Sequence, residues 1–360
     1  MIPWAKPDIG GREEEYVMQA LRSTWISGGK FVDEFEKSLS HLFHGKSVLA
    51  CSNGTSAIQL AYQVLGLQPG DELVIPGFGY MAAANVARQM GVVPVFADIR
   101  EDTWCLDTET VANHFSSRTR AVVAIHTYGS ACEMRSLVQV SEAAGIPVIE
   151  DCAESFGSIL DNQWLGTFGT IGTLSFQATK TISTGEGGAF ISSHPELLKL
   201  GALYRSHGVE AKRYWHVIPG NNYRLTNLQA AIGCAQLEQF ESFAQSRRRI
   251  AAKYRSLLGG DSRLSLQAAP PKMKAVPWTF GVRLLGVDAE RRDAVMHKLA
   301  SAGIETRPGF YTPNEMPGYG IHRIPRSEQV SQEMIVLPFY PSMTNSDLER
   351  VCSELLKNVQ

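Results

Sequence analysis

The chain has 360 residues, with 34 basic against 36 acidic side chains and 44% hydrophobic residues. This length is enough for a large α/β domain and a smaller second one, and the near balance of charge excludes a general attraction to nucleic acid. The first residues lack the apolar core of a signal peptide and no stretch reaches about 18 uninterrupted apolar residues, so we expect a cytoplasmic protein without a membrane span.

From about Ser47 onward, short β-branched runs alternate with segments of helical periodicity. The runs predict strands, and the segments between them carry apolar residues at the spacing of a helix. The predicted strands are 48–50, 73–75, 93–96, 121–124 and 147–150, and the predicted helices are 57–67, 82–90 and 133–144. Such alternation predicts an α/β fold whose mainly parallel sheet carries helices on both faces.

The second half of the chain continues this sheet and then changes character. Two apolar runs, 174–176 and 188–191, extend the sheet, and residues 226–258 predict one long helix with apolar side chains every three or four positions. Pro-rich loops follow, then an apolar run at 279–285 and helices at 289–302 and 346–356. We therefore expect a large domain of residues 1–250, including the N-terminal segment, and a smaller C-terminal α+β domain of residues 251–360.

The segment Cys-Ser-Asn-Gly-Thr-Ser-Ala at 51–57 predicts a helix start that can bind an anion. The first amides of a helix are unpaired and lie at the positive end of its dipole. Gly54 permits close approach of a phosphate, and Thr55 and Ser56 add hydroxyl donors. An ordinary helix cap has the same composition. The segment matches neither GxGxxG nor GxxxxGK[ST], so dinucleotide and P-loop sites lose their usual support.

Asp151 follows an apolar strand, at the edge where open α/β sheets place their ligands. Its carboxylate is suited to pair with a protonated ring nitrogen and so to keep a pyridine electron-poor. A turn or cap residue would explain Asp151 alone equally well. The adjacent Glu150 is a weaker candidate because strand alternation turns it to the opposite face.

Lys180 lies among small and hydroxyl residues and precedes a glycine-rich turn. A lysine forms a Schiff base only as the neutral amine, which desolvation and a nearby cation favour. Most lysines are instead solvated surface residues. Tyr80, in the loop Phe-Gly-Tyr at 78–80, offers a ring that can stack on a heterocycle. With the anion site and Asp151, these are the groups that pyridoxal phosphate requires.

The chain resembles the nucleotide-sugar aminotransferases of the DegT/DnrJ/StrS family over nearly its whole length. The motifs that carry the resemblance are Asn-Gly-Thr at 53–55, Glu-Asp at 150–151, Thr-Gly-Glu-Gly-Gly at 184–188, Thr-Trp-Ile-Ser at 24–27, Leu-Thr-Asn-Leu-Gln-Ala-Ala at 225–231 and Thr-Arg-Pro at 306–308. The resemblance implies the fold type I architecture of pyridoxal-phosphate-dependent transferases, which is that of aspartate aminotransferase.

The resemblance also implies roles for individual residues. Lys180 would hold pyridoxal 5′-phosphate as a Schiff base and move the proton between substrate and cofactor, while Asp151 would bind the ring nitrogen. The other implied cofactor contacts are Gly54, Thr55, Ser56 and Ser175 at the phosphate, Tyr80 on the ring, Glu154 near the phenolic oxygen, and Asn222 at the phosphate of the neighbouring subunit. A homodimer with two shared active sites follows.

Within the family, residues 213–216, Asn222 and Glu154 are similar to the branch that contains perosamine synthases. This implies transfer of the amino group of L-glutamate, through pyridoxamine phosphate, to C4 of GDP-4-keto-6-deoxymannose, in amino-sugar and O-antigen polysaccharide biosynthesis. A dTDP- or UDP-linked keto-sugar and amination at C3 remain open, because such enzymes share the same cofactor motifs. Trp25, Arg307 and Tyr311 are the expected substrate contacts.

Some positions depart from the common pattern of the family. Glu154 replaces a frequent glutamine and would need a proton or a donor partner. Phe156, Gln177 and Asn314 stand where relatives often have histidine, which leaves sugar recognition and proton handling open. The presence of Lys180 argues against the dehydratase relatives in which histidine replaces this lysine.

Other classes of protein fit the sequence less well. A non-catalytic regulatory protein that binds pyridoxal phosphate is the main alternative, and it would not convert glutamate to 2-oxoglutarate. A Rossmann dehydrogenase would need a glycine fingerprint near the N-terminus, and a hydrolase built on Cys152 would need a histidine that the sequence does not mark. The six cysteines are scattered without a CxxC pair, so we expect free thiols and no metal site.

Overall fold

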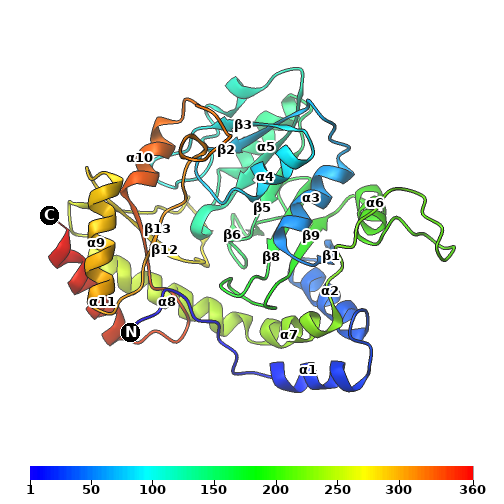
Figure 1. Ribbon diagram of the computed structural model, residues 1–360, viewed down its shortest axis with the longest axis horizontal. Helices are drawn as coiled ribbons and strands as arrows, with labels where there is room; N and C mark the ends of the chain where they lie inside the picture. The colour runs from blue at the N-terminus through cyan, green and yellow to red at the C-terminus, as the bar shows by residue number, and fades with distance from the viewer. Residues whose placement is uncertain (360) are drawn as a thin grey trace.

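The computed structural model describes residues 1–359. Its centre is a seven-stranded sheet with helices on both faces (Figure 1). In spatial order the strands are β1 (Ser47–Cys51), β9 (Gly188–Ser192), β8 (Ile171–Ser175), β5 (Val148–Asp151), β4 (Thr119–Ile125), β2 (Glu72–Pro76) and β3 (Val93–Ala97). All run parallel except β9, which pairs antiparallel with both neighbours. The predicted α/β fold with a mainly parallel sheet is confirmed.

Two apolar layers bury the sheet between its helices. One layer contains α1 (Glu13–Arg22), α2 (Lys30–Leu42), α5 (Met134–Ala143) and α7 (Asn227–Glu238), and the other contains α3 (Gly54–Val64), α4 (Ala82–Gln89) and α6 (Pro195–Arg205). In β4, Val122 packs into the first layer and Val123 into the second. Because both faces of the central strands are buried, their sequences are continuous apolar runs. No helix within residues 1–359 combines the length and the apolarity needed to cross a membrane.

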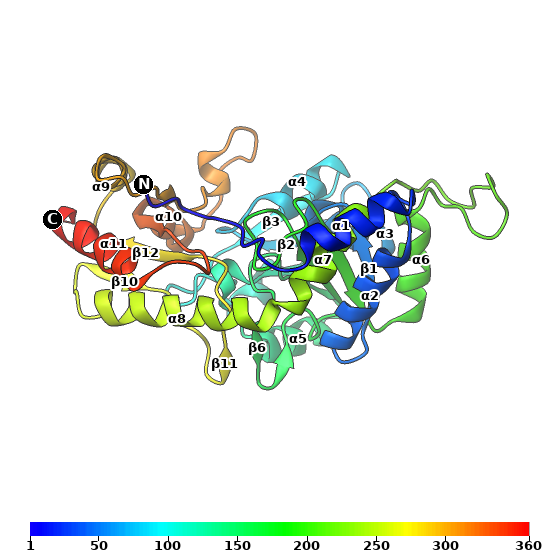
Figure 2. The same ribbon diagram turned by 90° about the horizontal axis from the view of Figure 1, so that it is seen from below.

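A second core forms around a four-stranded antiparallel sheet near the C-terminus, in a lobe that also holds both chain ends (Figure 2). Its elements are β10 (Leu264–Leu266), β12 (Phe280–Leu284), β14 (Met334–Leu337), β13 (Arg307–Pro308), α9 (Ala289–Ser301), α10 (Pro325–Glu333) and α11 (Asn345–Asn358). Ile2 belongs to this core and pairs with Ile304. A small three-stranded sheet joins β6 (Ile159–Leu160), β7 (Gln163–Trp164) and β11 (Met273–Lys274).

The prediction of one long helix at 226–258 is wrong at a single residue. The segment forms α7 and α8 (Phe240–Leu258), with a turn at Gln239 (φ −100°, ψ 0°) between them. The break turns Phe240 into the large-domain core, where its ring lies 5.1 Å from that of Phe156. Apolar spacing cannot reveal such a break because the same face continues on both sides.

The domain boundary that we propose near residue 250 falls inside α8. The first half of this helix packs through Phe240 and Phe243 against the large-domain core, and the second half packs through Ile250 and Tyr254 into the C-terminal core. Helix α8 therefore connects the two cores without a flexible linker.

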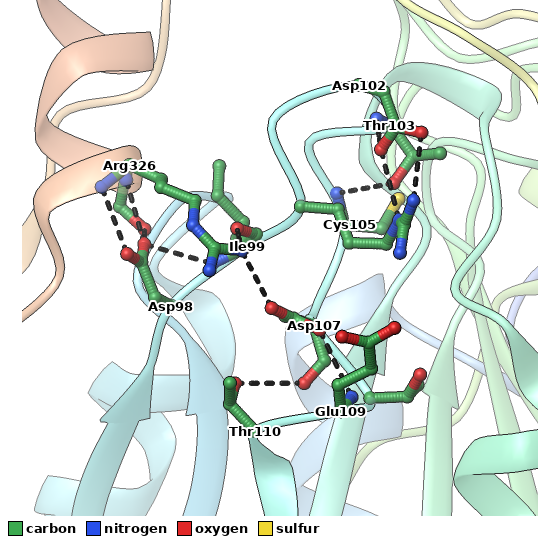
Figure 3. Close-up of polar contacts among 12 residues, drawn as sticks. Asp98, Ile99, Asp102, Thr103, Cys105, Asp107, Glu109, Thr110 and Arg326 are labelled. Atoms are coloured by element: carbon green, nitrogen blue, oxygen red, sulfur yellow. Dashed lines mark hydrogen bonds and ion pairs between the residues drawn. The ribbon is translucent and has the colours of Figure 1, made fainter.

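Asp98, directly after β3, joins α10 of the C-terminal lobe to the edge of the large sheet (Figure 3). Its carboxylate accepts hydrogen bonds from the backbone amides of Arg326 (3.0 Å) and Ser327 (2.9 Å). The Arg326 guanidinium in turn donates to Asp107 (2.7 Å). A carboxylate at a helix N-terminus satisfies amides that lack intrahelical partners. The N-terminal end of α10 is thereby held at the carboxyl edge of the sheet.

Candidate active site

The predicted cofactor residues converge on one edge of the large sheet. Because β1, β2, β5 and β8 run parallel, their carboxyl ends lie along the same edge, where open α/β sheets bind ligands. Gly54 begins the helix that follows β1, and Tyr80 follows β2. Asp151 ends β5, Ser175 ends β8, and Lys180 follows in the next turn. Segments far apart in the sequence thus meet at this edge.

Lys180 is largely buried and lies between an acid and an aromatic ring. Its Nζ is 3.9 Å from Glu154 Oε1 and 3.6 Å from the centre of the Trp278 ring. Burial lowers the pKa of Lys180; the carboxylates of Glu154 and Asp151 oppose this shift, and Arg247 adds to it. Since only a neutral amine is a nucleophile, these surroundings favour a lysine that forms a covalent bond with an aldehyde.

Asp151 is a buried carboxylate that has no cation in direct contact. Its Oδ1 accepts a hydrogen bond from the amide of Ala153 (3.0 Å), which is the one hydrogen bond of this side chain within residues 1–359. Burial raises the pKa of Asp151, and the hydrogen bond from the Ala153 amide and the positive charge of Lys180 lower it. A buried carboxylate is stabilised by a cationic partner, so the position fits the protonated nitrogen of a bound pyridine ring.

The start of α3 forms a cradle for a phosphate. Asn53 caps the helix by accepting from the amide of Ser56 (2.7 Å), and the Ser56 hydroxyl accepts from the amide of Asn53 (3.2 Å). The amides of Gly54 and Thr55 therefore remain free of intrahelical partners. A Cβ at Gly54 would lie 2.9 Å from Cβ of Ser175, so glycine keeps this space open. The residues present fit pyridoxal phosphate at its phosphate as well as at its ring nitrogen.

Comparison with known proteins identifies the family of this chain. The model of the DegT/DnrJ/EryC1/StrS aminotransferase family matches residues 7–356. The chain belongs to this family. A GDP-perosamine synthase from Escherichia coli O157:H7 is 36% identical over 98% of this chain and 97% of that protein.

Solved structures agree in fold. The aminotransferase TlmJ from Streptoalloteichus hindustanus has a TM-score of 0.94 at 28% identity, covering 99% of this chain and 98% of that chain. The PLP-form of Spr1654 from Streptococcus pneumoniae has a TM-score of 0.93 at 25% identity, covering 100% of each chain. Aminotransferases of this family depend on pyridoxal phosphate. The predicted family, fold type I architecture, cofactor and enzyme class are therefore confirmed, and a non-catalytic role is not favoured.

Glu154, where the resemblance leads us to expect a glutamine, lies in surroundings that accommodate a carboxylate. Its Oε2 accepts from the backbone amide of Tyr128 (2.8 Å), and its Oε1 faces the Lys180 amine. Burial raises the pKa of Glu154 to about 7, although Lys180 and the Tyr128 amide pull it down. The site thus supplies both the donor and the cation that a carboxylate needs at this position.

Replacing Glu154 by glutamine should flatten the pH dependence of stability. Because burial raises the folded-state pKa to about 7 from the ordinary value of 4.5, the folded protein favours the protonated acid, and this stabilisation is lost as pH rises from 4.5 through 7. We expect Glu154→Gln to gain about 2 kcal/mol of unfolding free energy relative to wild type between pH 5 and pH 8. Urea unfolding of the cofactor-free protein at both pH values measures this. The exposed Glu241→Gln is the control, and parallel profiles for Glu154→Gln and wild type would contradict the prediction.

The other three departures from the family pattern have structural roles. Phe156 is buried among aromatic rings of the large-domain core. Gln177 accepts from the amide (2.9 Å) and the hydroxyl (2.8 Å) of Thr179, which closes the turn before Lys180. Asn314 exchanges two hydrogen bonds with the backbone of His322. None of the three offers a free proton-transfer group comparable to the histidine often found there.

Within one chain, the structure does not bring the three predicted substrate residues together. Arg307 forms an ion pair with Glu305 (2.6 Å) on β13 of the C-terminal lobe. Tyr311 lies in the loop before α10 and is 45% exposed. Trp25, 71% exposed, lies between α1 and α2, which Figures 1 and 2 both place at the end of the molecule opposite this lobe. The substrate roles of these residues remain predictions.

The sequence did not indicate the aromatic group that includes Trp278, the ring against which Lys180 lies. The Trp278 ring faces the lysine amine, with Trp4 at 5.9 Å and Tyr128 at 6.2 Å between ring centres. Tyr128 also neighbours Phe310 at 5.1 Å. These rings come from four separate segments and no motif links them, so only the tertiary structure brings them together.

One buried group within residues 1–359 has the composition of a metal site, formed by His126, Glu150 and Cys152. The Glu150 carboxylate already accepts from His126 Nε2 (3.2 Å) and from the amides of Gly166, Phe168 and Gly169. The amide of Cys132 donates to Nδ1 of His126 (3.3 Å), which assigns the proton to Nε2. The group is therefore a hydrogen-bond network that holds β4, β5 and the 166–169 loop together.

Proposed function

We propose that this protein transfers the amino group of L-glutamate to C4 of a 4-keto-6-deoxy sugar carried on GDP, with GDP-4-keto-6-deoxymannose as the substrate. The observation that carries this proposal is similarity along the whole chain to proteins named GDP-perosamine synthase. Those from Escherichia coli O157:H7, Vibrio cholerae and Caulobacter vibrioides are 35 to 36% identical over 98% of this chain.

Each residue of the site has a part in this reaction. Pyridoxal phosphate, when bound, supplies the electron sink that makes the substrate C–H bond acidic. We infer that Lys180 Nζ would hold the cofactor covalently and that its free amine would move the proton during the reaction. Asp151 would keep the ring nitrogen protonated, and the amides of Gly54 and Thr55 would bind the phosphate together with the Ser175 hydroxyl. Glu154 lies close enough to Lys180 to orient its amine.

A substrate panel tests this function. The purified protein is incubated with L-glutamate and with GDP-, dTDP- and UDP-linked 4-keto- and 3-keto-6-deoxy sugars, and the amine product is identified by mass and NMR. We expect conversion of the GDP-linked 4-keto sugar. Conversion of a dTDP-sugar alone would reject the GDP assignment while retaining the aminotransferase. Failure to convert glutamate to 2-oxoglutarate would reject the enzyme itself.

We also propose a homodimer in which each subunit completes the active site of the other. The loop between α6 and α7 extends away from the body of the molecule (Figure 1) and carries Tyr214, 77% exposed, and Trp215, 59% exposed. Exposed aromatic side chains of this kind are typical of association surfaces. Asn222, at the end of this loop, pairs with Ser206 and accepts from Arg224 Nε (3.0 Å). In the proposed dimer Asn222 reaches the phosphate bound by the other subunit.

Mixing two inactive variants tests the shared site. Lys180→Ala and Asn222→Ala should each be strongly impaired, because every site of either homodimer lacks one group. In a mixed dimer one site carries both wild-type residues. Since random mixing makes half of the dimers mixed, we expect recovery of about a quarter of wild-type turnover after co-expression. If Asn222 serves its own subunit, the mixed population stays as inactive as the separate variants.

A further inference from the structure

Arg247 is a buried arginine without an acidic partner. It lies on the apolar face of α8, four residues after Phe243 and three before Ile250, and is 3% exposed. Burial lowers the pKa of Arg247 to about 10, and no carboxylate opposes this shift. A buried cation without a counter-charge is unfavourable, so its place in the fold calls for an explanation.

The Arg247 guanidinium joins two segments of the candidate site. Its Nη1 donates to the carbonyl oxygens of Trp278 (2.8 Å) and Pro277 (3.3 Å), and its Nη2 donates to the carbonyl oxygen of Lys180 (3.4 Å). A second link runs between the same segments, because the Trp278 indole N–H donates to the carbonyl of Thr179 (2.9 Å). The turn that carries Thr179 and Lys180 and the Pro277–Trp278 segment are therefore linked in two ways, through the Arg247 guanidinium and through the Trp278 indole.

This arrangement determines what the Lys180 amine contacts. The face of the Trp278 ring lies 3.6 Å from Nζ, a distance at which an aromatic face stabilises a cation. Trp278 is itself packed against the rings of Trp4 and Tyr128. The Lys180 amine therefore lies against a ring that its neighbours hold in place.

We propose that Arg247 is a positioning residue that holds the turn of Lys180 and the Trp278 ring as one unit and brings a fixed positive charge to the cavity that it shares with Lys180. The inference rests on the proposed role of Lys180 as the cofactor lysine. A fixed cation next to such a lysine favours its neutral, nucleophilic form.

The charges around Lys180 act in both directions. Glu154 and Asp151 raise the pKa of Lys180, whereas Arg247 lowers it in addition to the effect of burial. Lys6 and Asp8, of opposite charge, line the small cavity that Lys180 shares with Arg247. Of the groups that shift the Lys180 pKa, Arg247 is the one cation that offsets the two carboxylates.

The test uses the holoenzyme, in which the absorbance of the lysine-bound cofactor reports protonation of that linkage as pH changes. Arg247→Met removes the charge, and we expect the midpoint of this titration to rise by about one pH unit, a tenfold change in proton affinity. Arg247→Lys keeps the charge but cannot donate to three carbonyls in one plane. We expect it to retain the wild-type midpoint, with a kcat lowered about tenfold and an unchanged KM for glutamate.

Arg248→Met is the matched control, because Arg248 is the next residue of α8 and its guanidinium instead faces Glu241 (3.4 Å). It should show the wild-type midpoint. A wild-type midpoint in folded Arg247→Met would overturn the electrostatic part of the proposal, and wild-type kcat in Arg247→Lys would overturn the positioning part. If Arg247→Met does not fold, Arg247→Lys decides alone: a lower kcat at an unchanged midpoint supports the proposal, and an unchanged kcat overturns it.

Borohydride reduction followed by peptide mapping separates this inference from the proposed function. Reduced cofactor on Lys180 in all variants keeps the lysine assignment, whatever the titration midpoints are. Reduced cofactor on another lysine rejects the proposed function, and the inference with it.

Discussion

Replacing Lys180 by alanine is expected to abolish measurable turnover, a loss of about 10⁴-fold or more, since proton transfer by a positioned group alone contributes up to about that factor. The same change removes the amine that attaches to the cofactor, so borohydride should no longer fix the cofactor to the protein. Both effects follow from one side chain. The Lys180 amine lies between Glu154 and the Trp278 ring, and within residues 1–359 no other lysine amine contacts Glu154. Initial rates of amine-product formation and intact-protein mass after reduction measure the two effects.

Two controls distinguish charge from chemistry at this position. Lys180→Arg keeps a positive charge, but a guanidinium remains protonated and cannot attach to the cofactor, so it should be as inactive as Lys180→Ala. Lys357→Ala, which removes a lysine that is 72% exposed on the last helix, should retain full turnover. Turnover above a tenth of wild type in Lys180→Ala would contradict the assignment of the cofactor lysine.

The central sheet was predictable because its strands are short and buried on both faces. Val122 and Val123 each enter an apolar layer, so β4 is a continuous apolar run in the sequence. Strand order was not predictable, because the antiparallel β9 is inserted between β1 and β8 by long-range packing. The strands β6, β7 and β11 span two residues each, too few to show a period.

The candidate-site residues that lie at the end of a sheet strand, or soon after it, could be predicted from the sequence. Gly54, Asp151, Ser175 and Lys180 all follow or end parallel strands, and a motif places each of them in the sequence. Trp278 instead comes from a loop between the two cores and carries no motif.

Arg247 shows how a signal in the sequence can be hidden by its neighbours. It belongs to a run of three arginines, which resembles a solvated helix face. Its spacing from Phe243 and Ile250 nevertheless places it on the apolar stripe of α8. The position of an arginine in a line of apolar residues therefore indicates burial more strongly than the composition of the run indicates exposure.

Replacing Asp151 by asparagine should lower turnover by about 100-fold, because it keeps the shape of the side chain and removes the charge that pairs with the ring nitrogen. Breaking a buried charge pair from one side costs about 3 kcal/mol or more, which corresponds to about two factors of ten. Burial raises the pKa of Asp151, so the cofactor-free protein should instead tolerate the loss of this charge and show no decrease in unfolding free energy. Steady-state rates, cofactor titration by absorbance and urea unfolding of the cofactor-free protein measure the three quantities.

The contrast between a loss of turnover and an unchanged stability makes the Asp151→Asn variant diagnostic. A residue that only supports the fold would lose stability together with activity, whereas a cofactor partner loses cofactor affinity and turnover while the cofactor-free protein stays as stable as wild type. Asp161→Asn is the control, because Asp161 pairs at the surface with Arg135 (2.6 Å) and lies in a turn of the small sheet. Turnover of Asp151→Asn within threefold of wild type would remove the ring-nitrogen role and leave the buried carboxylate without its proposed cation.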